Sequence, residues 1–195
     1  MFKHIDSMHT SRPALQVGDV VFIRIPVGLF LKVAQASNSW SNHVGVVVGH
    51  DGTDWVVAES CVPRVRKGRF ADFVARSDQG SFVVRRLHRA LSDDEQDKLR
   101  AAADRRMGTL YHTGFALRSR RQFCSKFVHE VLAEACGEEV GEIETFATLL
   151  ARNPQVSLRF WRVWYFGRIP WQRETITPDS LLRSPRLMTT ADQGR

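Results

Sequence analysis

The strongest constraint on the fold is a β-hairpin predicted over residues 43–59. Residues 43–49 (His-Val-Gly-Val-Val-Val-Gly) are a short apolar run rich in β-branched side chains, which is typical of a buried strand. A turn containing Asp51-Gly52 follows, and residues 55–59 (Trp-Val-Val-Ala-Glu) return as a second strand. The pattern therefore indicates an antiparallel sheet in the first half of the chain.

The expected register of this hairpin pairs Gly49 with Trp55 and Val47 with Val57. Because strand side chains alternate between faces, His43 and Glu59 then share one face as diagonal neighbours. A carboxylate in that place can accept the imidazole N–H and stabilise the charged ring. A slip of one residue would move Glu59 to the opposite face. His50 and His112 remain alternatives for part of this role.

The remaining pattern predicts strands and helices that are partly segregated along the chain. A capping box at Ser92–Glu95 starts one helix, and Gly137 is placed to end another. Strands are expected over 20–24 and 81–87, and helices over 27–36, 92–107, 123–135 and 142–152. This order favours an α+β fold in which an antiparallel sheet packs against helices.

A chain of 195 residues without repeats or a Gly/Ser/Pro-rich linker indicates one domain. We expect this domain over residues 1–175, followed by a loose C-terminal tail over 176–195. The first residues lack the apolar core of a signal peptide, and no apolar stretch approaches the roughly 20 residues that span a bilayer. These features predict a cytoplasmic protein.

Cys124 is the strongest candidate for a reactive centre. It lies in the first turn of the helix predicted over 123–135 and follows a basic run, Arg118-Ser-Arg-Arg. The positive end of a helix and nearby arginines favour the thiolate, which is the nucleophilic form of cysteine. Cys61 is a rival thiol without a helix behind it, and Cys136 lies near a helix C-terminus, where a thiolate is disfavoured.

The three cysteines cannot all pair, and their spacing matches no zinc site, which favours a reducing compartment. No metal and no organic cofactor are predicted. Tyr111 is a weaker candidate that can donate its hydroxyl to a developing oxyanion, alongside the Cys124 backbone N–H. Ser41 and Asn42 are weaker candidates for shaping the cleft beside His43.

The formal net charge of +7 attracts anionic partners. This charge is spread along the chain without a nucleic-acid-binding motif, so nucleic acid is not the expected partner. Aromatic residues alternate with arginines over 158–171, and this segment either caps the cleft or rests on a membrane surface. The sequence does not predict an oligomeric state.

The order of these motifs resembles the YiiX/YebB-like cysteine hydrolases of the NlpC superfamily, most closely the YebB group. The resemblance is carried by Val17-Gly-Asp-Val-Val-Phe22, Ser39-Trp-Ser-Asn-His-Val-Gly-Val-Val47, Val57-Ala-Glu-Ser60 and Gln122-Phe-Cys-Ser-Lys-Phe-Val128, and it extends through 110–115, 140–146, 160–161 and 167–171. It implies a circularly permuted papain-like fold with a cysteine nucleophile, a histidine base and a third polar residue. These roles match Cys124, His43 and Glu59.

The function expected from these residues is hydrolysis of an amide bond through a thioester acyl-enzyme. The expected substrate is a small peptide or acyl compound, with peptidoglycan-derived peptides as one class. Two alternatives stay open: a lipid acyltransferase or thioesterase at a membrane surface, and a non-catalytic binding module with the same fold.

Overall fold

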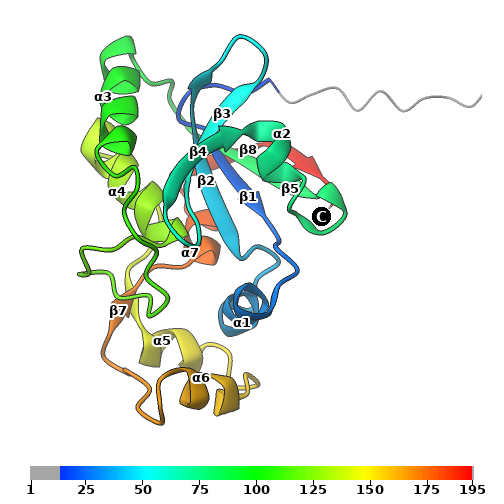
Figure 1. The fold of residues 1–195 in the computed structure, drawn as a ribbon, viewed down its shortest axis with the longest axis vertical. Coiled ribbons are helices and arrows are strands. Elements are labelled where there is room, and N and C mark those ends of the chain that lie inside the picture. Colours follow the sequence, from blue (N-terminus) through cyan, green and yellow to red (C-terminus); the bar gives the residue numbers. More distant parts are fainter. Residues whose placement is uncertain (1–13, 195) are drawn as a thin grey trace, which may run out of the picture.

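The hairpin lies at the centre of a six-stranded antiparallel sheet (Figure 1). The computed structural model describes residues 14–194. The strands lie side by side in the order β4-β3-β2-β1-β5-β8. In chain order they are β1 (Val20–Ile23), β2 (His43–His50), β3 (Trp55–Ser60), β4 (Val65–Arg69), β5 (Phe82–Leu87) and β8 (Leu187–Gln193). The strands that carry His43 and Glu59 are thus adjacent and internal.

The predicted register is confirmed at the middle of the hairpin and wrong at its turn. Val47 pairs with Val57, as expected. A bulge between Val47 and Gly49 adds one residue to β2, so that Gly49 lies opposite Val56 instead of Trp55. Because the bulge lies on the turn side of Val47, it does not alter the pairing toward His43.

Two helices, α3 (Asp93–Asp104) and α4 (Cys124–Cys136), cover one face of the sheet. The predicted capping box is present: the Ser92 hydroxyl accepts from the Glu95 N–H, and the Glu95 carboxylate accepts from the Ser92 N–H. Gly137 ends α4 with a φ of 73°, as predicted for a left-handed C-terminal residue. The prediction of both helices is therefore confirmed, within a few residues at their ends.

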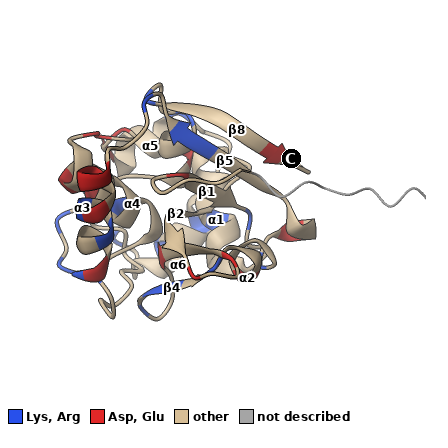
Figure 2. Ribbon diagram, turned by 90° about the horizontal axis from the view of Figure 1, so that it is seen from above, with Lys and Arg blue, Asp and Glu red and all other residues tan. Residues whose placement is uncertain are grey.

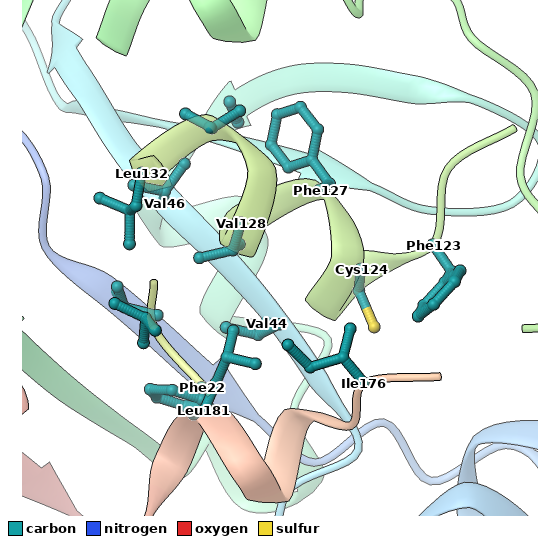
Figure 3. Packing of buried hydrophobic residues seen from close by; sticks show 14 of the residues in the cluster. Phe22, Val44, Val46, Phe123, Cys124, Phe127, Val128, Leu132, Ile176 and Leu181 are labelled. Atoms are coloured by element: carbon teal, nitrogen blue, oxygen red, sulfur yellow. The ribbon is translucent and has the colours of Figure 1, made fainter. Parts of the chain in front are cut away.

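The packing of α4 on β2 sets where its N-terminus lies. Figure 3 shows Val128 and Leu132 of α4 lying between the helix and β2, next to Val44 and Val46 of that strand. All four belong to one apolar cluster. Apolar contacts of this kind fix both the height and the rotation of a helix on a sheet. They bring Cys124, the first residue of α4, close to the first residues of β2.

A second apolar cluster covers the opposite face of the sheet and includes the short helix α2 (Phe70–Val74). Gly45 is needed here, because a Cβ at this position would lie 2.6 Å from the Val57 side chain and 3.0 Å from the Phe73 ring. Without a side chain, Gly45 lets Phe73 approach the sheet beside His43. Neither α2 nor the preceding strand β4 was predicted from the sequence.

The prediction of a loose tail is wrong for residues 176–194. This segment contains the helix α7 (Pro178–Leu182) and strand β8, which pairs with β5 along the sheet edge. Ile176, Leu181 and Leu187 are buried in the main apolar cluster, and this burial holds the segment in place. The domain therefore continues to residue 194, while the polar lead-in over 1–13 lies outside the described residues.

Three further helices lie together beyond one end of the sheet (Figure 1). They are α1 (Gly28–Ser37), α5 (Phe146–Ala151) and α6 (Leu158–Trp164). The helix predicted over 142–152 is shorter, because Glu144–Thr145 form the small strand β6 with β7 (Glu174–Thr175) and the Thr145 hydroxyl caps α5. Trp161 of α6 is buried, so this part of the aromatic segment packs on the domain.

Basic and acidic residues are interspersed along the ribbon, and α3 carries both kinds (Figure 2). Many of them form ion pairs, such as Lys98 with Asp94 and Arg106 with Glu134. Within residues 14–194, no helix combines the length and the apolar character needed to cross a bilayer.

Candidate active site

Cys124 begins α4, as the sequence predicted, and its side chain is buried. Its neighbours hold the start of the helix in place. The Ser125 hydroxyl donates to the Ile176 carbonyl at 2.7 Å, and the buried Lys126 ammonium donates to the carbonyls of Arg121, at 3.1 Å, and Ser119. The loop before Cys124 and the C-terminal segment are therefore both tied to the first turn of α4.

His43 is the first residue of β2, and its ring is completely buried. The ring packs between Phe30 of α1 and Phe73 of α2, with centroid distances of 5.8 and 5.7 Å. Its Nε2 lies 2.6 Å from Glu59 Oε2, so the predicted histidine–carboxylate pair is present. Among residues 14–194, Nδ1 finds no hydrogen-bond partner, which leaves this nitrogen free for the proton of a neighbouring group.

Glu59 is held by two arginines as well as by His43. Arg66 Nε donates to Oε1 at 3.1 Å, and Arg76 donates from a terminal nitrogen to Oε2 at 2.7 Å. Burial would raise the pKa of Glu59, but the hydrogen bond from His43 and the charges of His43 and Arg76 outweigh it and lower this pKa to about 2. Glu59 is therefore a carboxylate across the physiological pH range.

The pKa of His43 is displaced in the opposite direction. Burial would lower it, but the interactions with the Cys124 thiol and then with Glu59 outweigh burial and raise this pKa to about 9. The ring therefore keeps a second proton at neutral pH. Cys124, His43 and Glu59 thus form one electrostatic unit, built from the N-terminus of a helix and two adjacent strands.

Tyr111 lies beside Cys124 and is buried. Burial, and then the neighbouring Cys124, raise the pKa of Tyr111 well above its usual range, so the phenol keeps its proton. A protonated hydroxyl next to the thiol is a hydrogen-bond donor at the place where an oxyanion would form. The structure thus places the Tyr111 phenol next to the Cys124 thiol, and its role as an oxyanion donor stays a prediction.

Ser41 and Asn42 are buried and use their polar atoms on the backbone. The Ser41 hydroxyl contacts the carbonyls of Ile23 and His43, at 3.0 and 3.2 Å. The Asn42 amide accepts from the Ile25 N–H at 2.8 Å and donates to the Ile25 carbonyl at 3.0 Å. Both residues brace the start of β2. Asn42 also lines a cavity beside Cys124, whereas Ser41 does not, and their role in shaping a cleft beside His43 stays a prediction.

The rival thiols lie in less favourable surroundings. Burial, and then the charge of Glu59, raise the pKa of Cys61 to about 11, so this thiol stays protonated. The pKa of Cys136 is also raised, first of all by burial. Both thiols hydrogen-bond to backbone carbonyls, Cys61 to Arg64 and Cys136 to Leu132.

The alternative histidines do not contact His43. The His50 ring packs against Trp55 at the exposed end of β2, with a centroid distance of 5.3 Å. The Nδ1 of His112 accepts from the Gly114 N–H at 2.9 Å. Glu59, rather than either histidine, is therefore the group that orients the ring of His43.

Arg66 and Arg76 were missed by the sequence reasoning. Arg66 lies directly opposite Glu59 in the pairing of β3 with β4. The sequence of β4, Val-Arg-Lys-Gly-Arg, lacks the apolar alternation that marks a strand, so no pairing could be proposed. Arg76 follows α2 and also stacks on Phe73, with its guanidinium carbon 5.0 Å from the ring centroid.

Comparison with known proteins decides the family. Residues 14–190 match the family described as permuted papain-like amidase enzyme, YaeF/YiiX, C92 family. The chain belongs to this family of permuted papain-like amidases. The match covers most of the chain, including the three elements that carry Cys124, His43 and Glu59. The predicted resemblance to YiiX-like permuted papain-like enzymes and the predicted fold class are thereby confirmed.

Similar proteins in Escherichia coli span almost the same length. The uncharacterized protein YiiX of strain K12 is 28% identical over 178 residues, which cover 91% of this chain and 87% of YiiX. A crystal structure described as the metalloprotein yiiX of strain O157:H7 superposes with a TM-score of 0.80 at 26% identity. It covers 91% of this chain and 97% of that chain. This member of the permuted papain-like family therefore shares its fold with YiiX over 91% of its length.

Because the yiiX crystal structure is described as that of a metalloprotein, the metal ligands that this chain could offer are relevant. In the part of the chain that the structure describes, no three His, Cys, Asp or Glu side chains gather in a way that could hold a metal ion. Glu59, the acidic residue closest to His43, has its oxygens occupied by two arginines and that histidine. The residues present thus do not fit a metal centre at this place.

Proposed function

We propose that this permuted papain-like amidase hydrolyses an amide bond with Cys124 as nucleophile, His43 as proton carrier and Glu59 as the residue that orients His43. The observation that carries the proposal is the completely buried imidazole, which is bound to a carboxylate on one side and influenced by the thiol on the other. Such an arrangement separates charge between sulfur and ring before any substrate binds.

The reaction follows from these positions. The Cys124 proton moves to His43, and the sulfur attacks the amide carbon, so that an S–C bond forms and the carbonyl oxygen becomes an oxyanion. The Cys124 N–H and the Tyr111 hydroxyl donate to this oxygen. His43 then protonates the amide nitrogen, the C–N bond breaks and the amine leaves a thioester behind.

Water completes the cycle. His43 removes one proton from a water molecule, the resulting hydroxide adds to the thioester carbon, and the C–S bond breaks to release a carboxylic acid and the thiolate. Amide and water are thus converted to acid and amine, with the enzyme unchanged. The Glu59 carboxylate, which orients His43, takes no proton in this scheme. A peptidoglycan-derived peptide as substrate stays a prediction.

Alkylation by iodoacetamide tests the proposal without knowledge of the substrate. We expect iodoacetamide to alkylate Cys124 at pH 7 at least about tenfold faster than Cys136, because, among the described residues, Cys124 is the one of these two thiols with a histidine that can take its proton. His43→Gln should remove this preference. Peptide mass spectrometry at timed intervals measures the rate at each cysteine.

His129→Gln is the matched control, because His129 lies on the same helix and bonds to the Val140 carbonyl instead of a thiol. This variant should keep the wild-type rate at Cys124. Alkylation of Cys124 no faster than that of Cys136 in the wild-type protein would contradict the proposal.

A further inference from the structure

An apolar cavity opens directly beside Cys124. It is lined by side chains of α1, α5 and α6 and by the loops around them, among them Val33, Leu149, Phe115 and Trp161. The cavity has a volume of about 30 Å³, and a water-sized group needs about 10–15 Å³. It therefore accepts a slim group of a few atoms.

Three polar residues of the wall, Asn42, Ser125 and Thr177, use their polar atoms on the backbone. The Asn42 amide is bonded to the Ile25 backbone, the Ser125 hydroxyl to the Ile176 carbonyl, and the Thr177 hydroxyl to the Ser180 N–H. A charged group held against these three residues would lose its hydration without gaining hydrogen bonds from them. This wall therefore favours a hydrocarbon group.

The position of the cavity relative to the proposed residues decides which part of a substrate enters it. Cys124 and Tyr111 line the cavity, whereas His43 and Glu59 do not. The leaving amine must lie within reach of His43, which protonates it. The group that enters the cavity is therefore the one that remains bonded to sulfur in the thioester.

We propose that the substrate's acyl group is a slim aliphatic group, held in this cavity while the amine lies on the His43 side. This inference rests on the proposed function and names its substrate class. Each methylene moved from water into such a wall contributes a factor of about four in affinity. A carboxylate at the end of the same chain should reverse the gain.

Alkyl chloromethyl ketones measure this preference, because Cys124 displaces chloride and the alkyl group takes the acyl position. An S–C bond forms, the C–Cl bond breaks and chloride leaves. We expect the butyl ketone to label Cys124 about tenfold faster than the methyl ketone or more, and faster than the 2-carboxyethyl ketone. Intact-protein mass spectrometry gives the second-order rate constants.

Two substitutions change the cavity in opposite directions. Ala36→Leu fills it and should abolish the preference for butyl, while Leu149→Ala enlarges it and should move the preference to longer chains. Ala101→Leu makes the same Ala-to-Leu change on an exposed face of α3 and should leave the preference as in wild type.

Labelling of Cys124 without any chain-length preference would overturn this inference and leave the hydrolase proposal standing. Failure of every ketone to label Cys124 would count against both.

A second inference rests on a different surface, the outer side of α6. Val163 and Phe166 are 74% and 95% exposed. From Thr145 to Arg173 the chain contains five arginines and no acidic residue. Among the described residues, the exposed guanidinium groups of Arg159, Arg162 and Arg168 form no ion pair. An apolar tip surrounded by unpaired cations is complementary to an anionic lipid surface.

We propose that this surface, defined by Arg159, Arg162, Val163, Phe166 and Arg168, docks on a bilayer that contains anionic phospholipid. Sedimentation with vesicles of phosphatidylglycerol and phosphatidylcholine should pull down the protein, and vesicles of phosphatidylcholine alone should bind about tenfold less. Phe166→Ser should weaken binding to the anionic vesicles. Arg159→Gln/Arg162→Gln should lower the partition coefficient about tenfold or more.

Lys98→Gln/Arg105→Gln is the matched control, because it removes the same charge near α3, at the opposite end of the molecule (Figure 1). It should bind like the wild type. Equal binding to both kinds of vesicle, or equal losses in the two double variants, would overturn the docking proposal.

Discussion

Replacement of Cys124 by Ala is expected to reduce the hydrolysis of p-nitrophenyl butyrate by about 10³-fold or more. The proposed nucleophile is lost, and removal of such a group costs nearly all of the covalent pathway. The activated ester makes few demands on the leaving group, so it reports on the thiol alone. Initial rates at matched protein concentration measure the effect.

The same variant has a second readout that needs no substrate. Interaction with Cys124 contributes most to raising the pKa of His43, so this pKa should fall below about 9 in Cys124→Ala. Titration of the imidazole by NMR detects the change. Cys136→Ala, at the other end of α4, should alter neither the rate nor this pKa. Retention of full activity by Cys124→Ala would end the assignment of the nucleophile.

Glu59→Gln is expected to lower kcat/KM by about 10²–10⁴-fold, because an amide holds the imidazole without stabilising its charge. The pKa of His43 should fall, since Glu59 helps to raise it to about 9. The protonated ring is needed to release the amine. Activity should therefore decline as pH rises through about 9 in wild type and at lower pH in the variant. The pH dependence of kcat/KM measures both changes.

The raised pKa of His43 also links stability to pH. A folded-state pKa of about 9 against an ordinary 6.5 adds stability that is fully present below pH 6.5 and is lost as pH rises through 9. Its upper limit is about 3 kcal/mol, of which Glu59→Gln removes the part that Glu59 supplies. Urea unfolding should show the variant's deficit at pH 6 and a smaller one at pH 10.

Glu144→Gln is the control for the predicted change in the pH profile of Glu59→Gln, because it also changes a buried carboxylate paired with an arginine, Arg152. It should leave the alkaline limb of the pH profile in place. An identical loss of activity in both variants, without any shift of the limb, would show that Glu59 has only a structural role.

The contact between His43 and Glu59 was more predictable than its surroundings. Alternation along β2 and β3 was enough to place His43 and Glu59 on one face, because the bulge in β2 lies beyond Val47 and leaves that end of the hairpin in register. The positive φ at Gly137 and the capping box at Ser92 likewise follow from local preferences of single residues.

What could not be predicted depends on contacts distant in the sequence. β4 is a basic segment that becomes a strand only because β3 offers an edge to pair with, and Arg66 gains its role from that pairing. The segment after residue 176 looks polar in sequence, and its order comes from Leu181 and Leu187 entering the main apolar cluster. The local sequence pattern of β4 does not reveal that it pairs with β3, and that of the C-terminal segment does not reveal that it packs on the main cluster.

The bond from the Ser125 hydroxyl to the Ile176 carbonyl has a consequence for the synthesis of this protein. The ribosome releases the N-terminus of α4 about fifty residues before the segment around Ile176, which is bonded to it in the folded protein. The Cys124 thiol therefore leaves the ribosomal tunnel before this segment can cover it. During that interval the nascent polypeptide carries an unshielded cysteine. Shielding of the Cys124 thiol therefore waits until the chain around Ile176 has been synthesised.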